Sequence, residues 1–120
     1  MTKGKGNQKG FTLIELIMVM ALLAILAGLA VPRFTSVLTN ANEKANAANL
    51  KMLQDAVDLL ESDLAADGQA LPTGLTVENL KVGITINSKT YGPYIKSVPT
   101  PPQGHKVYTI ESGIVKNTDP

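Results

Sequence analysis

The sequence predicts an α+β protein in which one long N-terminal helix packs on a small antiparallel β-sheet. Three observations favour this fold class. Residues 11–31 are apolar except for two side chains, and apolar residues then recur every three or four positions as far as Leu64. The segment after residue 68 is rich in Gly, Pro, Thr and β-branched residues. The long helix should therefore have a transmembrane first half and an amphipathic second half, and only the second half should pack on the sheet.

The first ten residues, "MTKGKGNQKG", contain Lys3, Lys5 and Lys9 and no acidic residue. A short, polar, glycine-containing segment of this kind cannot bury enough apolar surface to fold by itself. Lysines that precede a membrane-spanning helix indicate a cytoplasmic location. Residues 1–10 are thus predicted to be a leader on the cytoplasmic side.

Residues 11–33 are predicted to form a transmembrane helix, because about 20 apolar residues are needed to cross a bilayer. Pro32 and Arg33 close the segment. A secretory signal peptide is the competing interpretation, but its apolar region usually runs about 7 to 15 residues and ends at a cleavage site with small residues. Here residues 16–31 are unbroken, follow the carboxylate of Glu15, and lead directly into a second helical pattern.

The third predicted region, residues 34–120, contains an amphipathic helix and a small C-terminal β-domain. The helical pattern continues the first helix and should end at Asp67 and Gly68, since glycine is a common helix stop. Leu53 and Leu60 are expected to be buried under the sheet, and Met52 to fill the core. The apolar stripe consists of Phe34, Val37, Leu38, Ala41, Ala45, Ala48, Met52, Leu53, Ala56, Val57, Leu60 and Leu64.

Short strands are predicted at residues 82–86, 107–110 and 114–116, with a turn at 111–113. The intervening stretch "YGPYIKSVPTPPQG" is rich in proline and glycine, so it is predicted to be an ordered loop and not a strand. The three tyrosines of this C-terminal segment are expected to be packing residues.

Composition argues against several classes of function. There is one histidine, His105, and no cysteine, and no serine lies in a nucleophile motif, so the chain is not expected to be an enzyme. No cofactor or metal site is expected, because acidic residues after Tyr94 are too few for a hard cation. The acidic residues of the amphipathic helix are expected to form a solvated face. No basic patch with interleaved aromatic residues indicates a nucleic-acid site.

The stretch "KGFTLIE" resembles the N-terminal signal of type IV pilins and pseudopilins. The matching features are Gly10, Phe11, the carboxylate of Glu15 at a fixed offset, and the long apolar run with Pro32. The resemblance implies a pilin-like fold and cleavage between Gly10 and Phe11 by a prepilin peptidase, followed by N-methylation of Phe11. It also implies that Glu15 and Phe11 act in filament assembly. Any loosening of the helix in a filament should be confined to Gly28 through Pro32.

The function implied by the resemblance is that of a structural subunit of a type IV pilus-like filament, assembled through the hydrophobic helix. A major pseudopilin of a type II secretion or competence pseudopilus is an alternative, and a membrane-anchored extracellular binding domain is another. The expected partners are sister subunits in a homopolymer, the prepilin peptidase and an inner-membrane assembly platform. The precursor should be a single-pass protein of the inner (cytoplasmic) membrane with its N-terminus inside, and the filament should be extracellular or periplasmic.

The carboxylate of Glu15 needs an explanation, because a charge near the hydrocarbon costs about 2 to 3 kcal/mol even on lenient scales. Cleavage before Phe11 would create an α-amino group that is positively charged at neutral pH. In a staggered bundle of helices, Glu15 of an incoming subunit would pair with this amino group of the subunit already docked. The alternative is a role within one chain, in which Glu15 complements the helix dipole.

Overall fold

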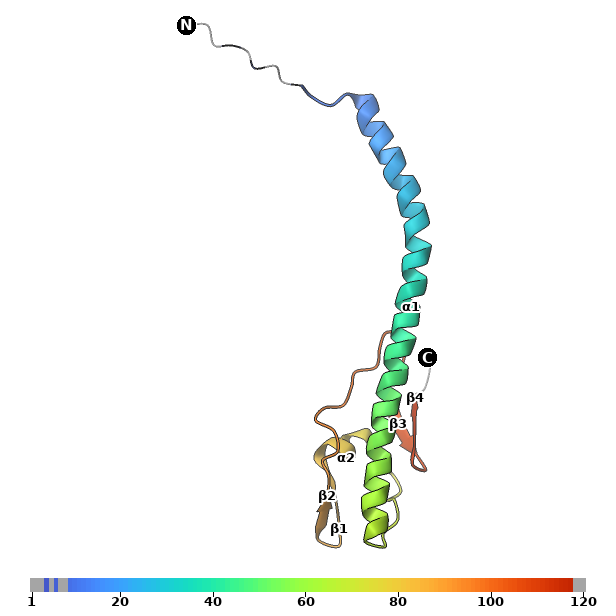
Figure 1. Cartoon of the computed structure of the whole chain (residues 1–120), viewed down its shortest axis with the longest axis vertical. Coiled ribbons are helices and arrows are strands. Elements are labelled where there is room, and N and C mark those ends of the chain that lie inside the picture. The colour runs from blue at the N-terminus through green and yellow to red at the C-terminus, as the bar shows by residue number, and fades with distance from the viewer. Residues whose placement is uncertain (1–3, 5, 7–8, 118–120) are drawn as a thin grey trace. The chain divides into compact units, whose positions relative to one another are not determined.

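The computed structural model describes Gly4, Gly6 and residues 9–117, so Lys3 and Lys5 of the predicted leader lie outside the described residues. The order of elements is α1 (Leu13–Ala66), α2 (Val77–Val82), β1 (Ile84–Ile86), β2 (Lys89–Tyr91), β3 (Tyr108–Glu111) and β4 (Ile114–Asn117) (Figure 1). The chain divides into two compact units, Met1–Leu38 and Thr39–Pro120. This architecture confirms the predicted α+β class with a long N-terminal helix and antiparallel strands.

Helix α1 is continuous for 54 residues and passes through Gly28 and Pro32 without a break. It begins at Leu13, two residues after the predicted start. At its other end Gly68 adopts a φ of +69°. The amide of Gly68 donates to Ala65 O at 3.0 Å and that of Gln69 donates to Leu64 O at 2.8 Å, which is a Schellman motif. The predicted stop at Asp67 and Gly68 is therefore confirmed.

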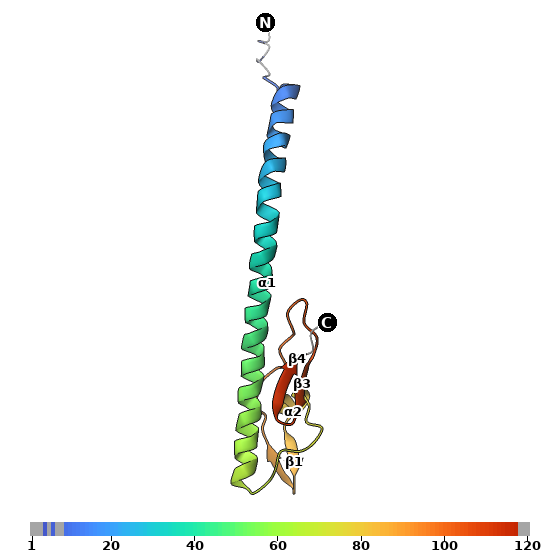
Figure 2. The ribbon, with the colours of Figure 1, turned by 90° about the vertical axis from the view of Figure 1, so that its right-hand side faces the viewer.

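The β-structure consists of two separate two-stranded antiparallel hairpins, so the prediction of one small sheet is wrong. Strand β1 pairs with β2, and β3 pairs with β4. Figures 1 and 2 show both hairpins beside the C-terminal half of α1, with β1 and β2 near its last turns. The loop between β2 and β3 contains no strand, as predicted.

Two elements were not predicted. Residues 77–82 form the short helix α2, so the strand predicted at residues 82–86 begins only at Ile84. Asn79 Oδ1 accepts a hydrogen bond from the amide of Thr76 at 2.8 Å at the start of this helix. Strand β2 follows a two-residue turn at Asn87 and Ser88, whose φ values are 49° and 65°. Both residues have the positive φ of a type I′ turn.

The core of the C-terminal unit forms where one face of α1 meets α2 and the two hairpins. Leu53 and Leu60 are 0% and 1% exposed, which confirms that both are buried. The other buried apolar residues are Ala56, Val57, Leu64, Leu75, Val77, Leu80, Tyr91, Tyr108 and Val115.

The predicted apolar stripe is covered only in part. Phe34, Val37 and Leu38 are 71%, 67% and 46% exposed, and Met52 is 42% exposed, so their predicted burial is wrong. Positions 34, 38, 41, 45, 52 and 59 share one side of a 3.6-residue helix, whereas positions 53, 57, 60 and 64 share an adjacent side. The chain's own hairpins cover only the second side.

Polar side chains of α1 fasten the β3–β4 hairpin. The hydroxyl of Tyr108 donates to Asn46 Oδ1 at 2.9 Å and accepts from Asn49 Nδ2 at 3.0 Å. Gln54 accepts from the amide of Val115 and donates to Gly113 O, both at 2.9 Å. Val115 lies opposite Ile110 in the ladder, and Gly113 lies in the turn. The amide of Val115 and the carbonyl of Gly113 thus find their hydrogen-bond partner in Gln54 of α1.

The β1–β2 hairpin and the following loop are fastened to the end of α1 by carboxylates. Asp67 Oδ2 accepts hydrogen bonds from Lys89 Nζ and, at 2.7 Å, from the hydroxyl of Tyr91. Asp63 Oδ2 accepts from the hydroxyl of Tyr94 at 2.7 Å. Tyr91 and Tyr108 are buried and Tyr94 is half-buried, so the tyrosines pack as predicted. The hydroxyls of Tyr94 and Tyr108 bond to residues of α1, and that of Tyr91 bonds to Asp67, the residue after the helix.

We expect Leu60→Ala to lower the free energy of unfolding of the C-terminal unit by about 2 to 5 kcal/mol, because it leaves a cavity at a fully buried position. Urea unfolding of the detergent-solubilised chain measures this through tyrosine fluorescence. The chain has no Trp, and its three Tyr all lie in this unit. Leu59→Ala is the matched control, since Leu59 is 57% exposed on the same helix. Equal losses for both variants would contradict the packing.

We also expect the C-terminal unit to lose stability at both extremes of pH. The hydrogen bond from Lys89, and then that from Tyr91, lowers the pKa of Asp67. A lowered carboxyl pKa contributes stability above the unfolded value of about 4, and this contribution is lost as pH falls through the folded pKa. Burial, and then the hydrogen bond to Asp63, raises the pKa of Tyr94 to about 12. A raised tyrosine pKa contributes stability below the unfolded value of about 10, and this contribution is lost as pH rises from about 10 to about 12.

The measurement is urea unfolding at a series of pH values. Asp67→Asn should flatten the acid limb of the stability curve, and Tyr94→Phe the alkaline limb. Glu43→Gln is the control, because Glu43 is an exposed carboxylate of α1 in the same unit. If Asp67→Asn and Glu43→Gln changed the acid limb equally, the bonds to Asp67 would not be its cause.

Candidate processing and assembly site

The predicted processing residues lie just before the first turn of α1. Gly10 and Phe11 precede the helix, and the side chain of Phe11 is 94% exposed. The backbone on both sides of the predicted cleavage point is thus outside regular structure. A protease needs such an unpaired backbone in order to reach a peptide bond.

Gly10 is not required by the fold of the chain. A Cβ atom added at Gly10 would meet no heavy atom within 4 Å, and its φ lies outside the left-handed region that favours glycine. Gly6 has the same open surroundings. Any restriction of position 10 to glycine must therefore come from a molecule that binds this segment.

Glu15 and Thr12 form a reciprocal pair of hydrogen bonds at the start of α1. The amide of Thr12 donates to Glu15 Oε2 at 3.2 Å, and the amide of Glu15 donates to Thr12 Oγ1 at 3.3 Å. The amide of Leu16 donates to Thr12 O at 3.3 Å, which is the first backbone bond of the helix. This arrangement is a capping box. The role of Thr12 was not predicted from the sequence, although the spacing T-x-x-E is the signature of this motif.

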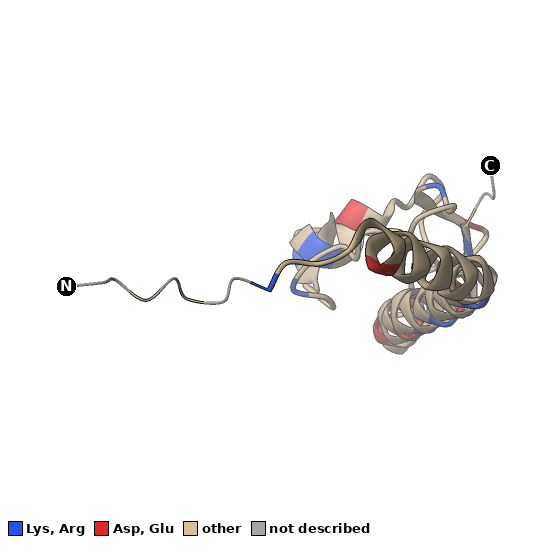
Figure 3. Ribbon diagram, turned by 90° about the horizontal axis from the view of Figure 1, so that it is seen from above, with Lys and Arg blue, Asp and Glu red and all other residues tan. Residues whose placement is uncertain are grey.

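The surface that follows Glu15 is apolar and uncovered. The large apolar side chains between Leu13 and Val31 are each at least 52% exposed. Glu15 is the one acidic residue in the first turn, and in Figure 3 the nearest turns of α1 are tan apart from one red segment. Helix α1 is long and apolar enough to cross a membrane. Apolar surface of this extent needs a bilayer or other helices as its surroundings.

Gly28 and Pro32, the predicted helix-loosening positions, lie more than three turns further along α1 and are exposed. The structure does not bring them near Glu15. Both are helical in the single chain, so loosening in a filament stays a prediction. Among the described residues, no group of three or more His, Asp or Glu side chains is placed to hold a metal ion.

Residues 5–31 match the family described as the prokaryotic N-terminal methylation motif. The chain is 30% identical over 114 residues to the type II secretion system core protein G of Aeromonas hydrophila, an alignment that covers 91% of this chain and 77% of the relative. It is 33% identical over 84 residues to the prepilin peptidase-dependent protein A of Clostridium perfringens, covering 69% of this chain and 60% of that relative. No solved structure matches the chain.

These similarities extend well beyond the methylation motif, because the first alignment includes almost the whole chain. The described fold, a long apolar and then amphipathic helix followed by antiparallel hairpins, agrees with them. The chain therefore belongs to the type IV pilin and pseudopilin family.

Proposed function

We propose that this protein is a structural subunit of a type IV pilus-like filament, held in the cytoplasmic membrane as a single-pass precursor until assembly. The observation that carries the proposal is the helix surface from Leu13 to Val31. It is exposed throughout, and it is apolar except for one carboxylate near its start, that of Glu15, which caps the amide of Thr12. A bilayer covers such a surface before assembly, and the same surface of sister subunits would cover it in a filament. Head-to-tail packing of this kind does not close, as an open filament requires.

The processing step proposed for this chain is cleavage between Gly10 and Phe11 by a prepilin peptidase, followed by N-methylation of Phe11. The methylation motif over residues 5–31 supports both reactions. The exposed, non-helical backbone at this point supports access by the peptidase. The leader would lie in the cytoplasm, with Lys9 at the membrane surface, and the C-terminal unit on the opposite side.

One relative is named a core protein of a type II secretion system. This similarity favours a pseudopilus of such a system as the specific form of the filament. The same subunit would then bind an assembly platform in the inner membrane and form a periplasmic filament. A pilus that extends from the cell is the other form that the same subunit could build. Electron microscopy of whole cells and of isolated envelopes distinguishes long external filaments from short periplasmic ones.

The intact mass of protein purified from its native membrane tests the proposed function. The filament subunit should lack residues 1–10 and carry one additional methyl group on Phe11. Deletion of the prepilin peptidase gene should restore the full-length mass in the same host. An unprocessed mass in the wild-type host would instead support a membrane-anchored binding domain, which needs neither modification.

A further inference from the structure

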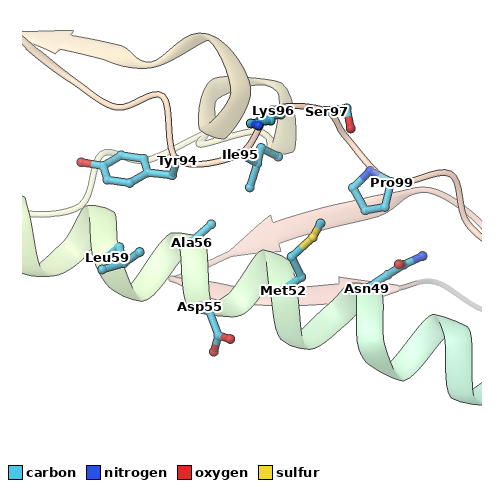
Figure 4. Close-up of a pocket in the computed structure, with 10 residues that line it drawn as sticks. All are labelled: Asn49, Met52, Asp55, Ala56, Leu59, Tyr94, Ile95, Lys96, Ser97 and Pro99. Carbon is cyan, nitrogen blue, oxygen red and sulfur yellow. The ribbon is translucent and has the colours of Figure 1, made fainter.

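An open apolar groove of about 500 Å³ lies in the C-terminal unit, between α1 and the loop from Tyr94 to Pro99. Figure 4 shows Met52 and Leu59 of α1 on one side of it and Ile95 and Pro99 on the other. Met52 and Leu59 are 42% and 57% exposed. These two side chains belong to the side of α1 that the chain's own hairpins leave uncovered.

The residues that line the groove include two of opposite charge, Asp55 from α1 and Lys96 from the loop. In Figure 4 the carboxylate of Asp55 lies on the outer edge and points away from the loop. Asp55 is already bonded to Lys51 at 3.1 Å, but the two side chains are 58% and 76% exposed. An exposed pair of this kind contributes little and exchanges partners readily. An occupant of the groove should therefore be apolar at its centre and should carry both a basic and an acidic side chain.

The outer face of the β3–β4 hairpin has this chemistry. Ile114 is 57% exposed, and it lies opposite Glu111 in the ladder. Lys116, two residues further along β4, bonds to Glu111 at 2.7 Å, and this pair is also largely exposed. Val115, on the other face of β4, is buried, so Ile114 and Lys116 point away from the core.

We propose that this groove binds the outer face of the β3–β4 hairpin of a second copy of the chain. Ile114 would enter the apolar groove, Lys116 would pair with Asp55, and Glu111 would pair with Lys96. The groove and the hairpin face are different surfaces, so each copy offers one of each, and the contact is head-to-tail. The proposal rests on the proposed filament function and adds to it a specific contact between C-terminal units.

Cysteine cross-linking in the full chain tests this contact, because the natural sequence contains no cysteine. The double variant Leu59→Cys/Ile114→Cys should give, on mild oxidation of filaments, a ladder of dimers, trimers and higher multimers on a non-reducing gel. Either single variant should stay monomeric on the gel, because no cysteine then lies opposite the introduced one in the proposed contact. The double variant Leu59→Cys/Val82→Cys is the matched control, since Val82 is an apolar residue that is 66% exposed outside the hairpin.

A charge exchange provides a second measurement that needs no cysteine. Asp55→Lys and Lys116→Asp should each lower the number of filaments several-fold, and the combination should restore much of the loss. Both single variants also lose a bond within their own chain, and the combination does not rebuild these bonds. Recovery in the combination is therefore expected only from a contact between copies.

The proposal is overturned if filaments of the Leu59→Cys/Ile114→Cys variant give no ladder, a disulfide within one chain, or a ladder no stronger than that of the Val82 control. If the double cysteine variant forms no filaments, the charge exchange decides: the proposed contact is overturned when Asp55→Lys combined with Lys116→Asp does not restore assembly. The intact mass of each variant is measured in parallel. Correct processing and filaments without the cross-link would reject only this contact, whereas an unprocessed wild-type chain would reject the proposed function.

Discussion

A Gly10→Val precursor should remain uncleaved and membrane-bound, and it should form no filaments. The proposed cut lies directly after Gly10, where a branched side chain would crowd the peptidase. Within this chain a Cβ atom at position 10 meets no heavy atom within 4 Å, and the φ of Gly10 lies outside the left-handed region that favours glycine. A loss of processing in this variant would thus report on the peptidase and not on folding.

The immunoblot compares precursor and mature bands in cells that express the peptidase. Gly6→Val is the matched control, because its surroundings are equally open and it lies on the same side of the proposed cut. The control should be processed normally. Normal processing of Gly10→Val would remove the assignment of the cleavage site and leave Gly10 as a spacer.

The parts of the fold that the sequence predicted are those determined by local patterns. The end of α1 was predictable because Gly68 is the residue that a Schellman motif requires at that position. Leu53 and Leu60 were predictable as core residues because they repeat at helical spacing on one side. The apolar run of residues 11–31 can be recognised as a membrane-spanning helix without any tertiary contacts, because its length and composition suffice.

The errors arise where tertiary contacts decide the outcome. Strand β2 is only three residues long and follows an Asn-Ser turn in place of the more common Asn-Gly. The β3–β4 hairpin is separate from the β1–β2 hairpin. Two of its backbone groups, the amide of Val115 and Gly113 O, bond instead to Gln54 of α1, a residue with no apparent pattern. The exposure of Met52 also has a tertiary cause, since periodicity does not distinguish the side of α1 that the hairpins cover from an apolar side that they leave exposed.

At the candidate site, the sequence identified Glu15 and gave a helix-dipole alternative for it. The structure makes that alternative more specific, because the carboxylate of Glu15 caps the amide of Thr12. A capping interaction is typically worth about 1 kcal/mol. This is less than the cost of about 2 to 3 kcal/mol for a carboxylate near hydrocarbon. On these magnitudes capping alone would not offset burial of the charge, which supports the proposed pairing with a group outside the chain.

Glu15→Val should leave processing and membrane insertion intact but abolish or sharply reduce filaments made of the mutant alone. In the proposed assembly, Glu15 of an incoming subunit pairs with the α-amino group of Phe11 in its neighbour. An amino group left unpaired in an apolar surrounding costs about 3 to 5 kcal/mol, which is enough to stop growth or alter the register. Electron microscopy and an immunoblot of the same cells give the number of filaments and the extent of processing.

Two further variants separate this ion pair from the capping box. Glu15→Gln keeps an oxygen that caps the amide of Thr12, since Glu and Gln both serve at this position, but it removes the charge. Thr12→Val removes the hydroxyl of the capping box and keeps the charge. If the carboxylate acts between subunits, Glu15→Gln should fail to assemble as Glu15→Val does, while Thr12→Val should still form filaments. The reverse pattern, with filaments from Glu15→Gln and none from Thr12→Val, would assign Glu15 to the helix start and exclude the pairing with Phe11.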